Sequence, residues 1–271
     1  MDNRLFIIEG VPCSGKSTTS KYIADVLQAD NKVCYIDEGS GVHPADYEFH
    51  AFLQEDDMTA FSDEEQAEIR FRSQCRCGGH IVALAQFSGS MFDRLLQKKI
   101  YDLLPWETEM PVMLDKWQQF CDSAEKYTVY VFNCVLLQNP MCETLMRFGF
   151  EQQRSLEYIT KIAQIIETMK PVVIYLKNDD VTTTVSKAAK EREGWLEGVV
   201  DYHVNGAYGK SIGAVGFDGY ISCLEERQRR ELEILSQLPL KSLVIENAHR
   251  DWDKAYQTID RYMEDLRKAH K

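Results

Sequence analysis

The segment Gly10–Ser17 (GVPCSGKS) fits the pattern G-x-x-x-x-G-K-[ST]. Its glycines let the backbone curl with the N–H groups pointing inward, and a following helix would add partial positive charge, so the segment suits phosphate oxygens. Lys16 would bring a mobile charge to the β- and γ-phosphates, and Ser17 would offer its hydroxyl to Mg²⁺. We predict a site for ATP with Mg²⁺, although the motif alone does not distinguish ATP from GTP. The residues expected to bind the nucleotide here are Gly10, Pro12, Cys13, Ser14, Gly15, Lys16, Ser17 and Thr18.

The sequence on either side of this segment predicts the elements that such a loop requires. The apolar run Leu5–Glu9 is typical of a buried strand, and Tyr22, Ile23, Val26 and Leu27 fall on one helical face. A strand, a phosphate loop and a helix in this order support the motif, whereas an ordinary turn between strand and helix is the alternative.

Four further apolar runs predict strands, with helical patterns between them. These runs are Val33–Asp37, Thr128–Leu137, Val172–Leu176 and Leu243–Glu246. The chain ends in an amphipathic helix that starts near Trp252. Strands that alternate with helices indicate a parallel sheet covered on both faces, with ligands at the carboxyl ends of the strands. We predict the α/β three-layer fold of a P-loop NTPase, with five parallel strands in the order 2-3-1-4-5.

We interpret residues 1–271 as a single domain that carries two insertions. The first covers 46–126, where the pattern is helical throughout. Ser62 is expected to cap a helix in this stretch, and Pro105 and Pro111 are expected to break the run.

The second insertion covers 180–220 and would serve as a lid. It begins with a charged helix over Asp180–Glu193, and Gly194–Gly219 follows with seven of the chain's fifteen glycines. We expect this glycine-rich segment to be a long, mobile loop or hairpin with a turn at Asn205-Gly206.

The excess of acidic over basic residues limits the kinds of molecule that the protein is expected to bind. With 43 acidic and 31 basic residues, the formal net charge is -12, which repels nucleic acid and anionic membrane surfaces. No apolar run approaches the roughly 20 residues of a membrane helix, so we expect a cytoplasmic protein. The eight cysteines are expected to be reduced and mostly buried, because only the C-x-C at Cys75 and Cys77 has a spacing that could suit a metal. The oligomeric state stays open, with a homodimer among the options.

Three stretches resemble the thymidylate kinase and deoxynucleoside kinase group of P-loop kinases. Glu9–Leu27 (EGVPCSGKSTTSKYIADVL) resembles the opening of these kinases, and Lys170–Leu176 with the basic helix after it resembles their strand and lid helix. Leu243–Arg250 (LVIENAHR) is similar to their last strand and adenine loop, which implies that Asn247 presents a backbone group to adenine. A simple turn between strand and helix is the alternative. The chain departs from the group after its third strand, where Asn133 stands in place of an acidic residue.

Asp37 and Glu38 are the candidates for the carboxylate that phosphoryl transfer needs. They close the second strand beside the phosphate loop, and the resemblance implies that Glu38 is the base; solvated carboxylates are the alternative. His43 could line the acceptor pocket, or Asp46 could instead cap the next helix. Asn133 could reach acceptor or magnesium water, or could be a buried, satisfied amide.

Two groups of cations could bind phosphate. Lys187, Lys190 and Arg192 lie on or near one face of the lid helix and could clamp the transferring group, unless they form a solvated face with the neighbouring glutamates. Arg70 and Arg72 in the first insertion could bind an anionic acceptor, with pairing to the glutamates within 64–68 as the alternative.

These features favour a small-molecule kinase that moves the γ-phosphate of ATP onto a nucleoside, nucleotide, sugar or drug-like acceptor. The alternative is an NTP-dependent regulatory ATPase or switch that binds a protein partner through the inserted helices. A polynucleotide kinase is opposed by the net negative charge.

Overall fold

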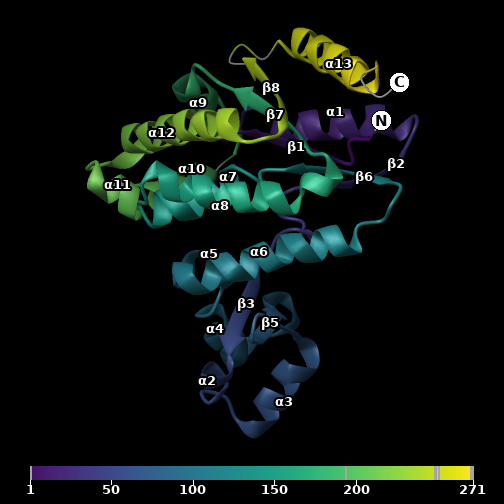
Figure 1. Cartoon of the computed structure of the whole chain (residues 1–271). Helices are drawn as coiled ribbons and strands as arrows, with labels where there is room; N and C mark the ends of the chain where they lie inside the picture. Colours follow the sequence, from purple (N-terminus) through teal and green to yellow (C-terminus); the bar gives the residue numbers. More distant parts are fainter. Residues whose placement is uncertain (1, 193, 247–248, 250, 269–271) are drawn as a thin grey trace. The chain divides into compact units, whose positions relative to one another are not determined.

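The computed structural model describes residues 2–192, 194–246, 249 and 251–268. The chain divides into two compact units, one formed by 1–38 and 124–271 and the other by 39–123. The second unit corresponds to the first predicted insertion, with its borders shifted by a few residues (Figure 1).

A five-stranded parallel sheet forms the middle of the first unit (Figure 1). When the five strands of this sheet are numbered in the order in which they occur in the chain, their order across the sheet is 2-3-1-4-5. The prediction of an α/β fold with this sheet is therefore confirmed. From one edge to the other, the strands are β2 (Lys32–Ile36), β6 (Thr128–Asn133), β1 (Leu5–Gly10), β7 (Val172–Lys177) and β8 (Lys241–Glu246).

The register brings the carboxyl ends of β2, β6 and β1 together at one edge. Ile8 pairs with Asn133, and Ile36 pairs with Phe132. β6 is shorter than the predicted Thr128–Leu137, because the chain turns at Cys134, whose φ is 66°. The polar residues that follow these strands therefore lie side by side next to the phosphate loop.

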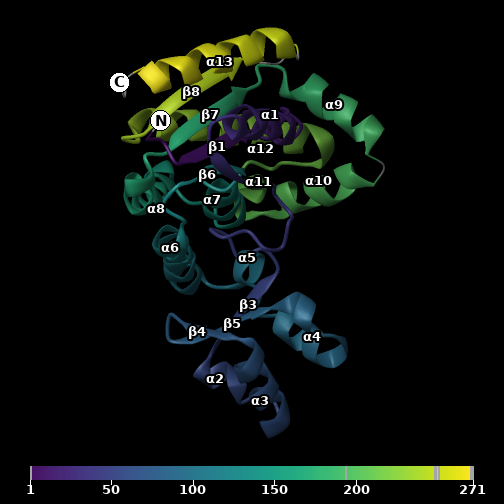
Figure 2. The ribbon, with the colours of Figure 1, turned by 90° about the vertical axis from the view of Figure 1, so that its right-hand side faces the viewer.

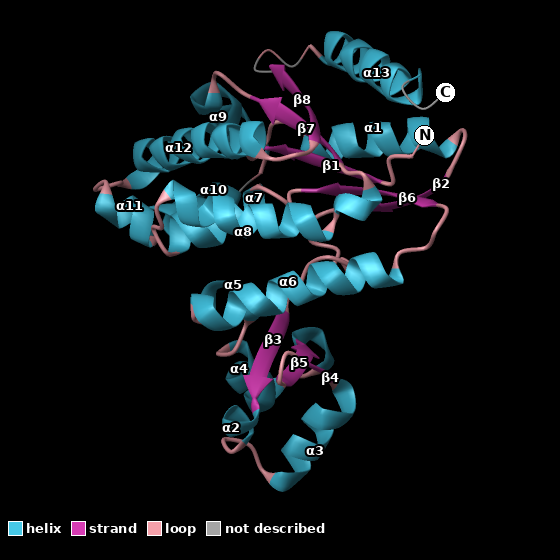
Figure 3. Cartoon of the chain, in the orientation of Figure 1, coloured by secondary structure: helices cyan, strands magenta, loops and turns pink. Residues whose placement is uncertain are grey.

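Helices cover both faces of the sheet, because the wholly buried strands present apolar side chains to each face (Figures 1 and 3). On one face, Ile23 of α1 (Lys16–Gln28) and Ile259 of α13 (Trp252–Lys268) pack in a core with Phe6 and Ile174. On the other face, the Tyr175 hydroxyl donates to Glu231 at 2.6 Å. The helices on this face include α8 (Gln152–Ile165) and α12 (Gly216–Gln237).

The Gly194–Gly219 segment is mostly helical, so the prediction of a loop or hairpin there is wrong. Helix α10 ends at Asn205, and a Cβ on Gly206 or Gly209 would come within 2.3 Å of a backbone carbonyl oxygen. The glycines at 206 and 209 thus allow backbone to pack closely against backbone. The predicted break at Asn205-Gly206 separates two helices. The other helical elements of this unit are α7 (Gln138–Met141), a π-helix (Cys142–Arg147), a 3-10 turn (Glu167–Met169), α9 (Val181–Glu191), α10 (Trp195–Asn205) and α11 (Ala207–Ser211).

Helices α9, α10 and α12 share a small apolar core, and Figure 2 shows α10 beside α12. This core contains Val185, Tyr220 and Leu224, and it includes Val11 from the phosphate loop. The segment predicted to act as a lid is therefore packed directly on the phosphate loop.

The second unit is not all helical, which corrects the prediction for 46–126. It contains a three-stranded antiparallel sheet in the order β3-β5-β4, on which Ala51, Leu53 and Val82 bury their side chains (Figure 3). Strands of three to five residues leave too short a pattern to detect in a sequence rich in helix formers. The elements are β3 (His50–Gln54), α2 (Glu55–Met58), α3 (Asp63–Arg72), β4 (Gln74–Arg76), β5 (Gly79–Ala83), a 3-10 turn (Leu84–Gln86), α4 (Gly89–Leu96), α5 (Ile100–Leu103) and α6 (Trp106–Ser123).

The helix signals within this unit are only partly confirmed. Ser62 caps α3 as predicted, since its side chain accepts the Glu65 N–H. Pro105 precedes α6, but Pro111 lies inside that helix rather than breaking it. Asp46 caps no helix, because the next element is strand β3; its carboxylate accepts the Tyr101 hydroxyl at 2.6 Å. No helix in the described part of the chain is long and apolar enough to cross a membrane.

Candidate functional site

The turn between β1 and α1 requires glycine at both ends of the Gly10–Ser17 motif. Gly10 has φ 143°, and a Cβ there would lie 2.6 Å from the Leu176 carbonyl oxygen. Gly15 has φ 94°, and a Cβ there would lie 2.0 Å from the Trp252 ring. Side chains at these two positions would be strained and would clash, so the two glycines are needed for the loop conformation.

The loop ends at the N-terminus of α1, which begins at Lys16. Its N-cap residue is Gly15, which has no side chain to cap the helix, so the first N–H groups of α1 are suited to bind an anion. Lys16 is only 7% exposed, and its Nζ donates to the carbonyl oxygens of Gly10 and Val11 at 2.9 Å each. The ammonium group is thus held over the loop backbone, within reach of anything the loop binds.

Asn133 connects the ends of β6 and β2 to the phosphate loop. It is fully buried, its Oδ1 accepts the Glu38 N–H at 2.8 Å, and its Nδ2 donates to the Asp37 carboxylate. The same Nδ2 lies 3.4 Å from the Ser17 Oγ. Asn133 is therefore a buried amide with satisfied hydrogen bonds, and it positions Asp37 and Glu38 relative to Ser17.

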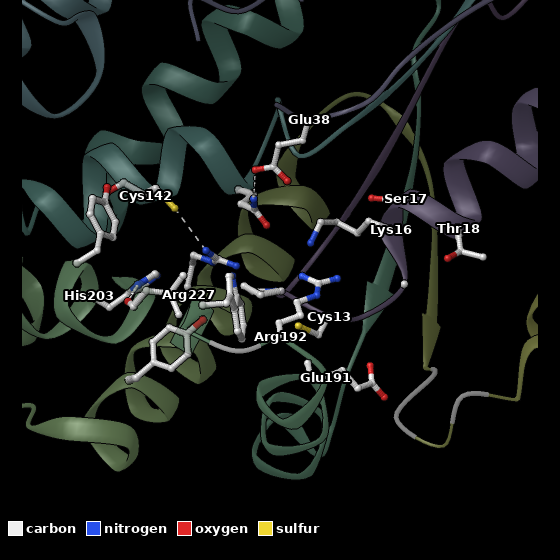
Figure 4. Close-up of a pocket in the computed structure, with 18 of the residues that line it drawn as sticks. Cys13, Lys16, Ser17, Thr18, Glu38, Cys142, Glu191, Arg192, His203 and Arg227 are labelled. Carbon is white, nitrogen blue, oxygen red and sulfur yellow. Dashed lines mark hydrogen bonds between the residues drawn. The ribbon is translucent and has the colours of Figure 1, made fainter. Parts of the chain in front are cut away.

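The Glu38 carboxylate is held by two donors. Gln138 Nε2 donates to Oε1 at 3.1 Å, and the Cys134 thiol donates to Oε2 at 3.2 Å. Burial raises the pKa of Cys134, so the sulfur keeps the proton that it donates. Figure 4 shows Glu38 on the same side of the cavity as Lys16 and Ser17. By contrast, the Asp37 carboxylate bonds to Asn133 and to the Glu38 N–H at 3.1 Å.

A cavity of about 580 Å³ joins the phosphate loop to Glu38 and to the helices that follow β7 (Figure 4). It is large enough for a small-molecule ligand. Its charged lining residues are Lys16, Glu38, Glu191, Arg192 and Arg227.

Arg227 is a buried cation of the cavity lining that the sequence analysis did not predict. It lies on α12 at 1% exposure, and its Nε is 3.1 Å from Glu231 Oε1, which is also fully buried. In the sequence it belongs to the charged run Glu225–Glu231, which has the pattern of a solvated helix face. Only the packing of α12 against the sheet shows that Arg227 is inside.

Glu9, the residue before the phosphate loop, is also buried. Its carboxylate accepts the N–H groups of Leu136 and Leu137 at Oε1 (2.8 and 2.9 Å) and of Gln138 at Oε2 (3.1 Å), which fixes the start of α7. Burial, together with the charge of Glu231, raises the pKa of Glu9 to about 7. Glu9 therefore changes its charge near neutral pH.

We predict that Glu9→Gln weakens the dependence of stability on pH. The pKa of Glu9 rises from its ordinary value of 4.5 to about 7 in the folded state, so its stabilising contribution is fully present below pH 4.5 and is lost as the pH rises through 7. From pH 5 to pH 8, the free energy of unfolding of the wild type should fall more than that of Glu9→Gln. The difference between the two decreases should be at most about 3 kcal/mol. Urea unfolding at both pH values measures this difference. A difference no larger than that of the exposed control Glu157→Gln would contradict the prediction.

The three predicted lid cations do not all reach the cavity. Arg192 lines it, and its guanidinium lies 5.7 Å from the Trp195 ring centroid. Lys187 and Lys190 are exposed to solvent. Among the residues that the structure describes, neither lysine lines the cavity. For these two lysines, the alternative of a solvated face fits the structure.

The predicted substrate residues His43, Arg70 and Arg72 lie in the second unit. Burial lowers the pKa of His43 to about 3, so it is neutral. Arg70 pairs with Glu55 at 2.7 Å, and Arg72 pairs with Glu68 at 2.9 Å, so both arginines form surface ion pairs. The predicted adenine contact at Asn247 lies outside the described residues.

None of the eight cysteines forms a disulfide, and only Cys134 and Cys223 are buried, so the expectation of mostly buried thiols is wrong. Within the described residues, no group of three or more His, Cys, Asp or Glu could hold a metal ion.

No protein-family model matches the chain, and no curated protein matches it. The resemblance to P-loop kinases therefore rests on the three stretches quoted above.

Proposed function

We propose that the chain is an ATP-dependent phosphotransferase with the fold of a P-loop NTPase. The observation that supports this most is the single cavity that joins the phosphate loop, with Lys16, to a carboxylate at Glu38. A kinase needs these two features in one space, because the triphosphate and the attacking hydroxyl must meet there.

The nucleotide would bind at the start of α1. The uncapped helix N-terminus and the inward-curled loop supply N–H donors, and Lys16 supplies the charge for the β- and γ-phosphates. Ser17 and the Asn133 amide lie together beside this loop and would hold Mg²⁺, directly or through water. Mg²⁺ would neutralise the charge that develops on the phosphates.

Glu38 would act as the base that orients the acceptor hydroxyl. Its two donors leave the carboxylate facing the cavity, whereas Asp37 is bonded to Asn133. Arg192 would contribute the lid charge that stabilises the transferring phosphoryl group.

A nucleotide-dependent switch is the second candidate. The second unit has its own core and its own sheet. Two of its apolar side chains, Phe71 and Val42, are 89% and 79% exposed, and such side chains could contact a protein partner. Asn133 also stands where an acidic residue would strengthen catalysis.

The direct test is a screen of nucleosides, nucleotides and sugars for acceptor-dependent ATP consumption, with mass spectrometry of the products. A kinase gives an acceptor that gains one phosphoryl group. ATP hydrolysis with no phosphorylated product, in a screen that covers all three classes, would favour the switch.

Ser17→Ala should raise the Mg²⁺ concentration needed for half-maximal turnover, by about tenfold, because one oxygen ligand is lost. The measurement is a Mg²⁺ titration of the initial rate at saturating ATP. Ser17→Thr keeps the hydroxyl and should restore the wild-type titration. If Ser17→Ala and wild type give the same titration, Ser17 is not a magnesium ligand.

A further inference from the structure

Arg227 has hydrogen-bonding capacity that no described residue uses. Its Nε is near Glu231 by distance but without hydrogen-bond geometry, and Nη2 has no partner among the described residues. Nη1 donates only to the Cys142 sulfur at 3.4 Å, and a sulfur atom is a weak acceptor. A guanidinium removed from water with unfilled donors costs free energy, unless the cavity that it lines receives an acceptor.

The residues around Arg227 balance its charge but do not use all of its hydrogen-bond donors. Glu231 is the nearest buried carboxylate, and it also accepts the Tyr175 hydroxyl at 2.6 Å. The ion pair balances the charge of Arg227 while its outer nitrogens remain available. Two such nitrogens in one plane match a carboxylate or a phosphate.

The residues next to Arg227 add one donor and two acceptors to the same cavity. Tyr220 has a hydroxyl without a partner among the described residues, and its ring lies 4.8 Å from that of His203. Nδ1 of His203 is 2.7 Å from the Val199 carbonyl oxygen, which can only accept, so Nδ1 carries the proton and Nε2 is an acceptor. Burial lowers the pKa of His203 to about 4, which keeps it neutral. Gln138 adds the second acceptor, its unpartnered Oε1.

Arg227 and His203 lie away from the part of the cavity that would hold the nucleotide. Figure 4 shows Arg227, Cys142 and His203 on the opposite side of the cavity from Ser17 and Thr18, with Lys16 between. Trp195 and Tyr202 also line the cavity and give it apolar surface. The cavity therefore has one end for phosphates at the loop and a second end with a cation, a donor and the His203 acceptor, and Gln138 adds its acceptor beside Glu38.

We propose that Arg227 binds an oxyanion of the acceptor, so that the acceptor is a small molecule bearing a carboxylate or a phosphate together with a hydroxyl or N–H group. The oxyanion pairs with Arg227 and Tyr220, and the hydroxyl or N–H group donates to His203 or Gln138. This inference depends on the proposed kinase function, because it assigns the loop end of the cavity to ATP.

Inorganic phosphate and acetate are the probes for the test. Each is titrated calorimetrically into protein that has been saturated with Mg²⁺ and a non-hydrolysable ATP analogue. The two variants are Arg227→Met/Glu231→Gln, which leaves no lone buried charge, and Tyr220→Phe, which removes only the hydroxyl. Wild type should bind at least one probe beside the analogue, and the probe that binds more tightly identifies the oxyanion.

The double variant should weaken probe binding by at least tenfold, and Tyr220→Phe by about fivefold, whereas ADP affinity should change by less than about twofold. Tyr220→Phe keeps the test decisive if the double variant does not fold. Probe binding that occurs only without the analogue, or that neither variant weakens, would overturn the inference. A double variant that loses the analogue but keeps ADP would also overturn it, because Arg227 would then hold the γ-phosphate. Wild-type protein that does not bind ADP would instead overturn the proposed function.

Discussion

Replacing Lys16 by alanine should reduce ATP turnover by about 10³-fold or more. Lys16 Nζ donates to the carbonyl oxygens of Gly10 and Val11 within the loop itself, so its loss removes the full positive charge that the loop would bring to the β- and γ-phosphates. Turnover is measured as ADP release at saturating ATP and Mg²⁺, after an acceptor has been found.

The matched control is Lys21→Ala, on the same helix. Lys21 is exposed and pairs with Asp25 four residues on, so its loss removes a surface ion pair and nothing at the loop. Its turnover should equal that of wild type. A folded Lys16→Ala protein with wild-type turnover would rule out the assignment of Gly10–Ser17 as the nucleotide site.

Glu38→Gln should lower kcat by roughly 10²- to 10⁴-fold, the range for loss of a positioned acid or base. The amide keeps the shape of the carboxylate but cannot take the proton of an acceptor hydroxyl. ATP affinity should change little, because Glu38 is not expected to contact the phosphates. Steady-state kinetics with varied ATP and varied acceptor separate the two effects.

Asp37→Asn is the comparison for Glu38→Gln. The Asp37 carboxylate accepts from Asn133 and from the Glu38 N–H, so its loss should lower stability more than kcat. If Asp37→Asn lowers kcat strongly and Glu38→Gln does not, then Asp37 and not Glu38 is the base. If neither substitution changes kcat, the attacking group is a phosphate that needs no base, and Arg192 becomes the residue to replace.

The parts of the fold that were predictable have strong local patterns. The fully buried strands β1 and β7 are nearly continuous apolar runs, and the capping box of Ser62 is readable in four residues. The antiparallel sheet of the second unit was missed because its strands are short and lie among helix-forming residues. The helices within Gly194–Gly219 are not evident in the sequence because glycine is typical of loops, whereas Gly206 and Gly209 here allow close packing of the backbone.

The candidate site also has parts that the sequence predicts and parts that only the structure shows. The phosphate loop was readable because its chemistry depends on backbone conformation, which glycines at fixed spacing largely determine. The carboxylate candidates at the end of the second strand were readable because parallel strands present their carboxyl ends at one edge. The sequence could not show that Gln138 and Cys134 hold Glu38, because these contacts span about a hundred residues.

By itself, then, the sequence determined the sheet of five parallel strands, the loop Gly10–Ser17 and the place of Glu38 at its edge, since each depends on neighbouring residues or on strand alternation. Only the tertiary structure decided which charges enter the cavity: it placed Arg192 and Arg227 in the lining, left Lys187 and Lys190 in solvent, and put Arg70 and Arg72 in surface pairs. The physical reason is that an arginine in a charged helix has the same local pattern whether it faces water or a buried carboxylate. Its direction depends on packing against segments far away in the chain.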